Sequence, residues 1–458
     1  MLMKRTVFIG SFLTVFCIGA DPVFAQSATR PSKGTTRPVV IEGNVTDAVT
    51  HQLLKDFTVS IGIQAHPSLE PGFNTARGFH DGHYSVEVPQ GSIRAAAWYV
   101  RIEASNYAPM DSDPLHDSAT ADFQLQPGTN LTGRVVGSNG APVPDVTVSL
   151  IQRGQPQLLL NGKVVVGPRS ATTDKQGRYE FPPQSDRFLL MAVGSSGFAY
   201  DYLDDPSAHP ELKLAPWGRV EGRVMSGDKP AAGLDINIQG LVAIDPTPVE
   251  RNVSRLEQES WTKTGADGRF VIEHLAPGEI RILSSKKKSG LDGPNETESS
   301  LQMAAVVEPG ATVKAAIGGT GRPVVGKLIL PDELNGKRNW NALAGLNTMI
   351  PSRPIAPNYL RMTAVEREQW IFGFDNTDSG NAYKQVRLAA LNYAFTLNPD
   401  GSYRIEDVPP GNYEIRFTLI MYGGRDMGTT LQQITVPPSD APRSDEALEL
   451  PDIIFKPR

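Results

Sequence analysis

Cysteine is almost absent from this chain of 458 residues, which contains one, Cys17, near its N-terminus. With a single cysteine the chain forms no internal disulfide, and it has neither a C-x-x-C redox pair nor a zinc site built from several thiolates. If the N-terminal segment is removed, as expected below, a thiol nucleophile is excluded as well. Hydrophobic cores must therefore hold the fold together.

Three other features are missing. Acidic residues outnumber basic ones by 50 to 44, so the chain lacks the basic surface that nucleic-acid phosphates require. Beyond the N-terminal segment, no run approaches the roughly 20 apolar residues of a membrane span. The GxSxG, HExxH and P-loop signatures do not occur. We therefore expect a monomer that is not an enzyme, with no catalytic residue, no cofactor, no nucleic-acid partner and no membrane span after the N-terminal segment.

The N-terminus has the pattern of a secretory signal peptide. Lys4 and Arg5 precede an apolar stretch over residues 6–20, and small residues flank Phe24 before a cleavage site after Ala25. A retained membrane anchor is the alternative, and the pattern leaves open which applies. Residues 26–37 show no apolar periodicity and are expected to be a flexible leader. We predict an exported protein that is periplasmic, displayed on the cell surface or extracellular.

Glycine (43 residues) and proline (37) are plentiful, which favours many short strands joined by turns. A turn of the form Asp-(x)-Gly-x-aromatic occurs four times. Asp-Gly suits such a hairpin because glycine adopts positive φ without a Cβ clash and aspartate hydrogen-bonds the local backbone. The four copies are Asp81–Tyr84, Asp174–Tyr179, Asp267–Phe270 and Asp400–Tyr403.

A strand-like segment with a central glycine precedes each turn. The four glycines, Gly43, Gly133, Gly222 and Gly326, are 90, 89 and 104 residues apart, which is one sandwich domain per interval. Because a glycine inside a strand usually marks a close backbone approach, its recurrence suggests a shared geometric need.

The spacing from the opening glycine to the turn glycine is 39, 44, 46 and 75 residues in the four units. The long last interval predicts an insertion at about residues 336–390. Within it, Thr363 and Glu366 have the spacing of a capping box, which predicts a short helix continuing through Trp370.

These motifs resemble those of carboxypeptidase regulatory-like domains, which are seven-stranded prealbumin-like sandwiches similar to collagen-binding B-type repeats. The resemblance rests on Gly-Arg-Val at 133–135 and 222–224, on Thr173–Tyr179 and on Ile405–Tyr413. The larger arrangement of units, including the segment Pro216–Gly222, is similar to that of multi-domain extracytoplasmic bacterial proteins. The zinc residues of the family's enzymes belong to another domain, and none is matched here.

The resemblance and the spacing together imply an all-β chain. We expect a tandem array of four Greek-key β-sandwiches, prealbumin-like or immunoglobulin-like, with a short helical insertion in the last. The expected boundaries are 1–25 for the signal peptide, 26–37 for the leader, and 38–128 (divergent), 129–216, 217–318 and 319–458 for the sandwiches.

Two histidines at the first turn, His80 and His83, are weak candidates for a metal site, with His66 or His116 as a third ligand. A polar hairpin tip that contains histidines explains them better, because no third ligand is fixed by spacing. We therefore predict no metal.

Two groups of aromatic residues are candidates for ligand binding, because aromatic faces can stack on sugar rings. Phe198, Tyr200 and Tyr202 alternate and share one face of a strand, which is more often the inward face of a sandwich. The second group lies in the insertion, where the aromatics serve equally well as a small core that orders a long loop. It comprises Trp340, Tyr359, Trp370 and Tyr383.

The first functional hypothesis is a secreted, non-catalytic module that binds carbohydrate or an envelope protein through its loops and insertion. The second is a purely structural stalk of sandwich repeats. An unrecognised hydrolase, or the accessory subunit of one, is the third.

Overall fold

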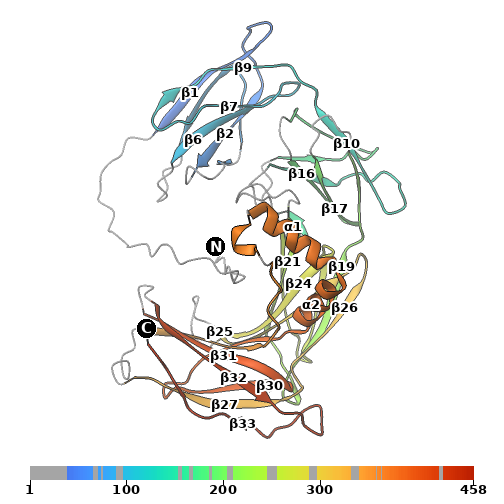
Figure 1. Cartoon of the computed structure of the whole chain (residues 1–458). Helices are drawn as coiled ribbons and strands as arrows, with labels where there is room; N and C mark the ends of the chain where they lie inside the picture. Colours follow the sequence, from blue (N-terminus) through green and yellow to red (C-terminus); the bar gives the residue numbers. More distant parts are fainter. Residues whose placement is uncertain are drawn as a thin grey trace, which may run out of the picture.

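Four β-sandwiches follow one another along a curved path, and two α-helices lie on its inner side (Figure 1). The chain is an all-β tandem array with a short helical insertion in its fourth unit. The computed structural model describes residues 39–64, 71–73, 76–88, 96–152, 157–164, 169–184, 188–203, 210–244, 255–287, 297–331, 340–356, 358–362, 364–421 and 426–457. The expected signal peptide and leader lie outside these residues. Among the helices so described, none is long and apolar enough to cross a membrane.

Each unit, called a repeat below, uses seven strand positions, A to G, in two sheets. Strand A pairs antiparallel with D and parallel with G, and the facing sheet has the order C-B-E-F.

Repeat 1 places A in β1 (Val40–Asp47), B in β2 (Phe57–Gln64) and C in the short β3 (Gly72–Phe73) and β4 (Arg77–Phe79). D is β5 (His83–Glu87), E is β6 (Ala97–Glu103), F is β7 (Met110–Asp111), and G is divided into β8 (Ala119–Thr120) and β9 (Phe123–Leu125).

Repeat 2 has A in β10 (Leu131–Val136), B in β11 (Thr147–Gln152), C in β14 (Ser170–Thr172) and D in β15 (Arg178–Phe181). E is β16 (Phe188–Gly194), F is β17 (Gly197–Leu203) and G is β18 (Glu211–Lys213). An additional hairpin between B and C consists of β12 (Gln157–Leu160) and β13 (Lys163–Val164).

Repeat 3 has the longest strands of the first three. A is β19 (Gly218–Ser226), followed by the short β20 (Lys229–Pro230), B is β21 (Asp235–Ile244) and C is β22 (Arg255–Lys263). D is β23 (Arg269–Leu275), E is β24 (Gly278–Lys287), F is β25 (Thr297–Val307) and G is β26 (Thr312–Ile317).

Repeat 4 has A in β27 (Arg322–Ile329), B in β28 (Trp340–Thr348), C in β29 (Asn392–Phe395) and D in β30 (Ser402–Val408). E is β31 (Gly411–Met421), F is β32 (Asp426–Val436) and G is β33 (Leu448–Glu449) with β34 (Ile453–Ile454). Between B and C lie a 3-10 turn, η1 (Tyr359–Arg361), and the helices α1 (Ala364–Asp375) and α2 (Asp378–Ala389).

The insertion differs in detail from the sequence prediction of residues 336–390. Residues 340–348 of that range form strand β28, which pairs with β31 and β29, so the chain leaves the sheet only after Thr348. The first helix continues past Trp370 to Asp375, and a second helix follows it.

The turn glycines adopt the positive φ that the motif requires. The φ values are 82° at Gly82, 72° at Gly177, 76° at Gly268 and 83° at Gly401. The expected hairpin is wrong, however, because each turn joins strand C to strand D, which lie in different sheets. Each opening glycine lies on strand A directly opposite the aromatic residue of its turn motif on strand D, for example Gly133 opposite Tyr179. The two recurring motifs are therefore cross-strand partners.

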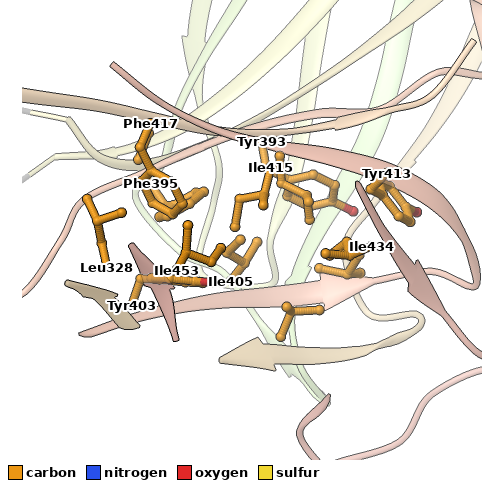
Figure 2. Packing of buried hydrophobic residues seen from close by; sticks show 14 of the residues in the cluster. Leu328, Tyr393, Phe395, Tyr403, Ile405, Tyr413, Ile415, Phe417, Ile434 and Ile453 are labelled. Carbon is orange, nitrogen blue, oxygen red and sulfur yellow. The ribbon is translucent and has the colours of Figure 1, made fainter. Parts of the chain in front are cut away.

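Apolar side chains fill the space between the two sheets of each repeat. In repeat 4 the rings of Phe395, Tyr403 and Phe417 contact one another within the core, with ring centroids 5.2 to 5.9 Å apart (Figure 2). Ile405 and Ile415, from strands D and E, pack beside them.

One sheet runs through three repeats. β12 of repeat 2 pairs in parallel with β22 of repeat 3, from Gln157 opposite Leu256 to Leu160 opposite Glu259. At its other side, β25 of repeat 3 pairs antiparallel with β29 of repeat 4, from Ser299 opposite Phe395 to Gln302 opposite Asn392. The result is a ten-stranded sheet that ends at β13 and β32.

Candidate functional site

The helices α1 and α2 form a helical arm (residues 364–389) whose aromatic side chains contact one another. Trp370 and Phe374, one turn apart on α1, are stacked at 5.5 Å with their planes 4° apart. Tyr359 meets Trp370 edge to face at 6.4 Å, and Tyr383 of α2 meets Phe374 at 6.3 Å. Three of the predicted aromatics thus share one half-buried stack.

Arginines enclose this stack. The guanidinium of Arg353 lies 5.9 Å from the Phe374 ring centre and 5.8 Å from that of Tyr383, and it pairs with Asp375. Arg367 lies 5.2 Å from the Tyr359 ring and donates to the Tyr359 carbonyl at 3.0 Å. A cation over an aromatic face is stabilising by about 0.5–1 kcal/mol at an exposed site. The stack therefore works as the small core of the insertion.

Trp340, the fourth aromatic predicted for the insertion, lies on a strand and not on the helical arm. It begins strand β28 opposite Met421 of β31. Sequence reasoning missed Phe374 instead, although its spacing of four residues from Trp370 places both on one helix face.

The helical arm is held against repeat 3 by a two-pronged ion pair. Arg387 of α2 donates to both carboxylate oxygens of Glu279 on β24, at 2.7 and 2.5 Å. α2 also contacts β25. The N-terminus of α2 is capped by Thr377, whose hydroxyl accepts a hydrogen bond from the Gly380 N–H at 3.0 Å. The arm of repeat 4 is thus docked on the neighbouring repeat.

The aromatic row of β17 lies at the junction between repeats 2 and 3. The opposite face of the strand, with Ala199, belongs to the core of repeat 2, so the inward-face interpretation of the row is wrong. Phe198 is buried and packs on Trp217 of repeat 3 at 5.7 Å. Tyr202 is partly buried beside it, and Tyr200 is 43% exposed at the margin.

The first-turn histidines are far from a metal geometry. Both are exposed, and His80 Nδ1 lies 2.8 Å from Asp56 Oδ1. His83 lies on β5 and lines an open hollow with Glu42 and Asp81. Across the part of the chain that the structure describes, no three His, Cys, Asp or Glu side chains are grouped to hold a metal ion. His66 lies outside those residues.

Repeats 1 and 2 meet at a buried ion pair between Glu103 of β6 and Arg169. Arg169 also donates to Gln184 Oε1 at 3.2 Å. Burial, and then the charge of Arg101, lower the pKa of Arg169 from its ordinary value. A buried ion pair of this kind stabilises the junction only while both charges are present, because the loss of one leaves the other buried without a partner.

Repeats 2 and 3 share a hydrophobic cluster of their own. Ile151, Leu159, Leu189, Met191 and Phe198 of repeat 2 pack with Leu256 and Ala276 of repeat 3, and all seven are buried. Trp217 closes one side and donates its indole N–H to the Gly194 carbonyl at 2.8 Å. The interface resembles a domain core rather than a surface contact.

Repeats 3 and 4 are joined by the paired strands β25 and β29 and by side chains that serve both. Leu301 of β25 packs against the cores of both repeats. The Gly227 N–H of repeat 3 donates to Asp407 Oδ2 of repeat 4 at 3.0 Å. Tyr393 donates to the Asp407 carbonyl at 2.9 Å, and burial raises the pKa of this tyrosine.

Comparison with known proteins yields structural similarity alone. No family model matches the chain, and no curated protein matches it. Among solved structures, it is similar to a Streptococcal ancillary pilin, with 12% identity, 61% of this chain and 99% of that chain covered, and a TM-score of 0.21. The chain is also similar to the minor pilin of Streptococcus agalactiae, with 16% identity, 41% of this chain and 94% of that chain covered, and a TM-score of 0.23. For the major pilin subunit of Bacillus cereus the identity is 11%, 61% of this chain and 99% of that chain are covered, and the TM-score is 0.17. TM-scores and identities of this size do not indicate a function for this chain.

Proposed function

We propose that the chain is a non-catalytic structural spacer in which repeats 2 to 4 act as one rigid body. The observation that carries the proposal is the ten-stranded sheet, which crosses both junctions between these repeats. Inter-repeat hydrogen bonding along paired strands fixes orientation more strictly than a flexible linker does, because sliding or bending breaks several bonds together.

Burial between the repeats supports the same conclusion. Leu159 of repeat 2 and Leu256 of repeat 3 are at most 1% exposed, although both lie outside the sandwich core of their own repeat. Full burial of a leucine side chain is stabilising by roughly 1.5–3 kcal/mol. The junction therefore couples the stability of one repeat to that of the next, as in repeat proteins with strong nearest-neighbour interfaces.

The proposal includes a location outside the cytoplasm and a place among the carboxypeptidase regulatory-like repeat proteins. The location rests on the basic and apolar pattern of residues 1–25, and the family on the recurring glycine and Asp-Gly motifs. A rigid array at the cell surface or in the envelope sets a distance between whatever is attached to its two ends.

Rigidity is tested by single-molecule energy transfer between dyes on cysteines introduced at Lys175 in repeat 2 and Glu446 in repeat 4, with Cys17→Ser removing the native thiol. We expect one narrow distribution that broadens in Leu256→Ala, which empties part of the shared cluster. Ile236→Ala is the matched control, because this fully buried residue belongs only to the core of repeat 3. A broad distribution in the unmodified array would overturn the spacer proposal.

Recognition of carbohydrate or an envelope protein by the helical arm is a second candidate function. It draws on one observation, the half-buried aromatic stack around Trp370. Helix α1, which carries Trp370, lies on the inner side of the curve (Figure 1). Binding to a glycan array or an envelope fraction should be lost in Trp370→Ala and kept in Tyr200→Ala, an aromatic truncation outside the arm. Absence of binding by the unmodified protein to both would eliminate this candidate.

A further inference from the structure

Strand β32 is the last strand of the ten-stranded sheet, and one of its edges pairs with no strand among the described residues. Its eleven residues make it the longest strand that ends a sheet in the described part of the chain, and β31 is its only strand partner there. Lys456 donates its backbone N–H to the Thr430 hydroxyl at 3.0 Å, which is a bond to a side chain and not to the strand backbone. A long row of free N–H and C=O groups is a template for pairing with another strand.

The composition of β32 does not protect this edge. Its one charged residue, Asp426, is the first of the strand, and residues 427–436 contain neither a charge nor a proline, the two devices that usually prevent edge pairing. The other described strands of five or more residues that end a sheet have at most seven residues, so none has an uncharged run as long, and each carries at least one charge. They are β5 (Glu87), β17 (Asp201), β23 (Arg269 and Glu273), β26 (Lys314) and β30 (Arg404, Glu406 and Asp407).

The same edge is already a joining surface elsewhere in the molecule. In repeat 3, strand F is β25, and its outer edge is covered by the antiparallel strand β29 of repeat 4. β32 is strand F of repeat 4, so an antiparallel strand placed on it would continue the sheet in the manner seen at the preceding junction.

β32 itself is the strand that fits this edge. An antiparallel pair of identical strands is related by a two-fold axis, so one surface serves both copies and the contact closes. With the axis at Leu431, the leucines of the two copies face each other, and Thr429 of each faces Gln433 of the other. Leu431 is 50% exposed on the outer face of the sheet, and this register buries it without opposing like charges.

We propose that two copies of this chain associate through antiparallel pairing of β32 with β32, so that the ten-stranded sheet of one copy continues into that of the other. The sequence alone predicts a monomer, and this inference departs from it. The dimer goes beyond the spacer function, because rigidity within one chain does not depend on it.

Sedimentation velocity of the full chain, over a hundredfold range of concentration, tests the pairing. We expect a monomer–dimer equilibrium that Leu431→Lys shifts to monomer, because a lysine guards the edge. Leu343→Lys is the matched control, since Leu343 is 56% exposed on the same sheet face but lies on β28, which is paired on both sides. It should leave the dimer unchanged. Monomer at every concentration, or equal loss in both variants, would refute the pairing.

A second experiment does not depend on the folding of the lysine variant. In a Cys17→Ser background, Leu431→Cys places two thiols opposite each other at the axis, within the range of disulfide formation. Mild oxidation should crosslink Leu431→Cys into dimers and leave Leu343→Cys as monomer. Equal crosslinking of both would show random collision and contradict the proposed register.

Discussion

Gly222 and Phe270 lie directly opposite each other on β19 and β23, and the phenyl ring occupies the space that a side chain at residue 222 would fill. A Cβ there would be 2.2 Å from the ring Cζ and 2.9 Å from the Ala315 carbonyl oxygen. The same relationship joins Gly133 to Tyr179, at 2.2 Å from the phenol oxygen, and Gly326 to Tyr403, at 2.5 Å. A ring that covers a strand glycine thus ties strand A to strand D in these repeats.

Gly222→Ala is therefore expected to destabilise repeat 3 by roughly 1–3 kcal/mol, the cost of forcing a methyl group into a filled core. Phe270→Leu should relieve part of that cost, so the double variant should be more stable than the sum of the single changes predicts. Urea unfolding of the four proteins measures the coupling. Additive effects would show that the ring and the glycine do not depend on each other.

Gly373→Ala provides the matched control. Outside the backbone of its own helix, no described atom lies within 4 Å of a Cβ built at Gly373, and the residue is in the last turn of α1. Alanine is favoured over glycine by roughly 1 kcal/mol in a helix interior, so this change near the end of α1 should stabilise the helix by at most that amount.

The sequence predicts the repeats better than their junctions. Positive φ at an Asp-Gly turn follows from local sterics, so the position of each turn can be derived from its own Asp-Gly motif. The cross-strand partner of a strand glycine cannot be derived in this way. Gly222 and Phe270 are 48 residues apart, and only the folded sheet sets their register.

The aromatic row of β17 shows why the candidate site was harder to predict. Alternation reveals that Phe198 and Tyr202 share a face, yet it does not reveal what covers that face. The cover is Leu256 and Trp217 of the next repeat, and no period in the sequence connects these residues to β17. Phe374, in contrast, can be predicted from the sequence, because a helix that continues one turn past Trp370 places both rings on the same face.

The ion pair that docks the helical arm makes a second prediction. Glu279→Gln removes the charge that holds Arg387, and we expect faster amide hydrogen exchange in α2 with little change in the sandwich cores. Because the two side chains are only about three-quarters buried, the loss should be near 1 kcal/mol. Glu406→Gln, which removes the exposed pair with Arg404, should leave exchange in α2 unchanged.

Acid stability of repeat 1 should depend on Asp47. Hydrogen bonds from the N–H of Thr50, from the Tyr107 hydroxyl and from the N–H of Val49, each 2.7 Å long, lower its pKa to about 2. A depressed folded pKa contributes stability above the ordinary value of 3.8, and that stability is lost as the pH falls toward 2. Unfolding measured from pH 5 to about 2 should show this loss in the native protein and less of it in Asp47→Asn.

The buried pair of Glu103 and Arg169 predicts an asymmetric response. Glu103→Gln leaves the arginine charge without its partner and should destabilise the junction of repeats 1 and 2 by about 3–5 kcal/mol. The double change Glu103→Leu with Arg169→Met removes both charges and should recover most of that loss. Thermal unfolding of the three proteins measures the difference. A double variant as unstable as Glu103→Gln would contradict it.

The ten-stranded sheet also has a consequence for the order in which the chain acquires its structure during synthesis. β12 reaches its partner only after Leu256 to Glu259 have been made, about a hundred residues later, and β25 waits in the same way for β29. Repeats 2 and 3 therefore each present an uncovered strand until the next repeat has folded, which exposes an unfinished chain to misassembly. Synthesis from the N-terminus thus completes these repeats in overlapping pairs rather than one at a time.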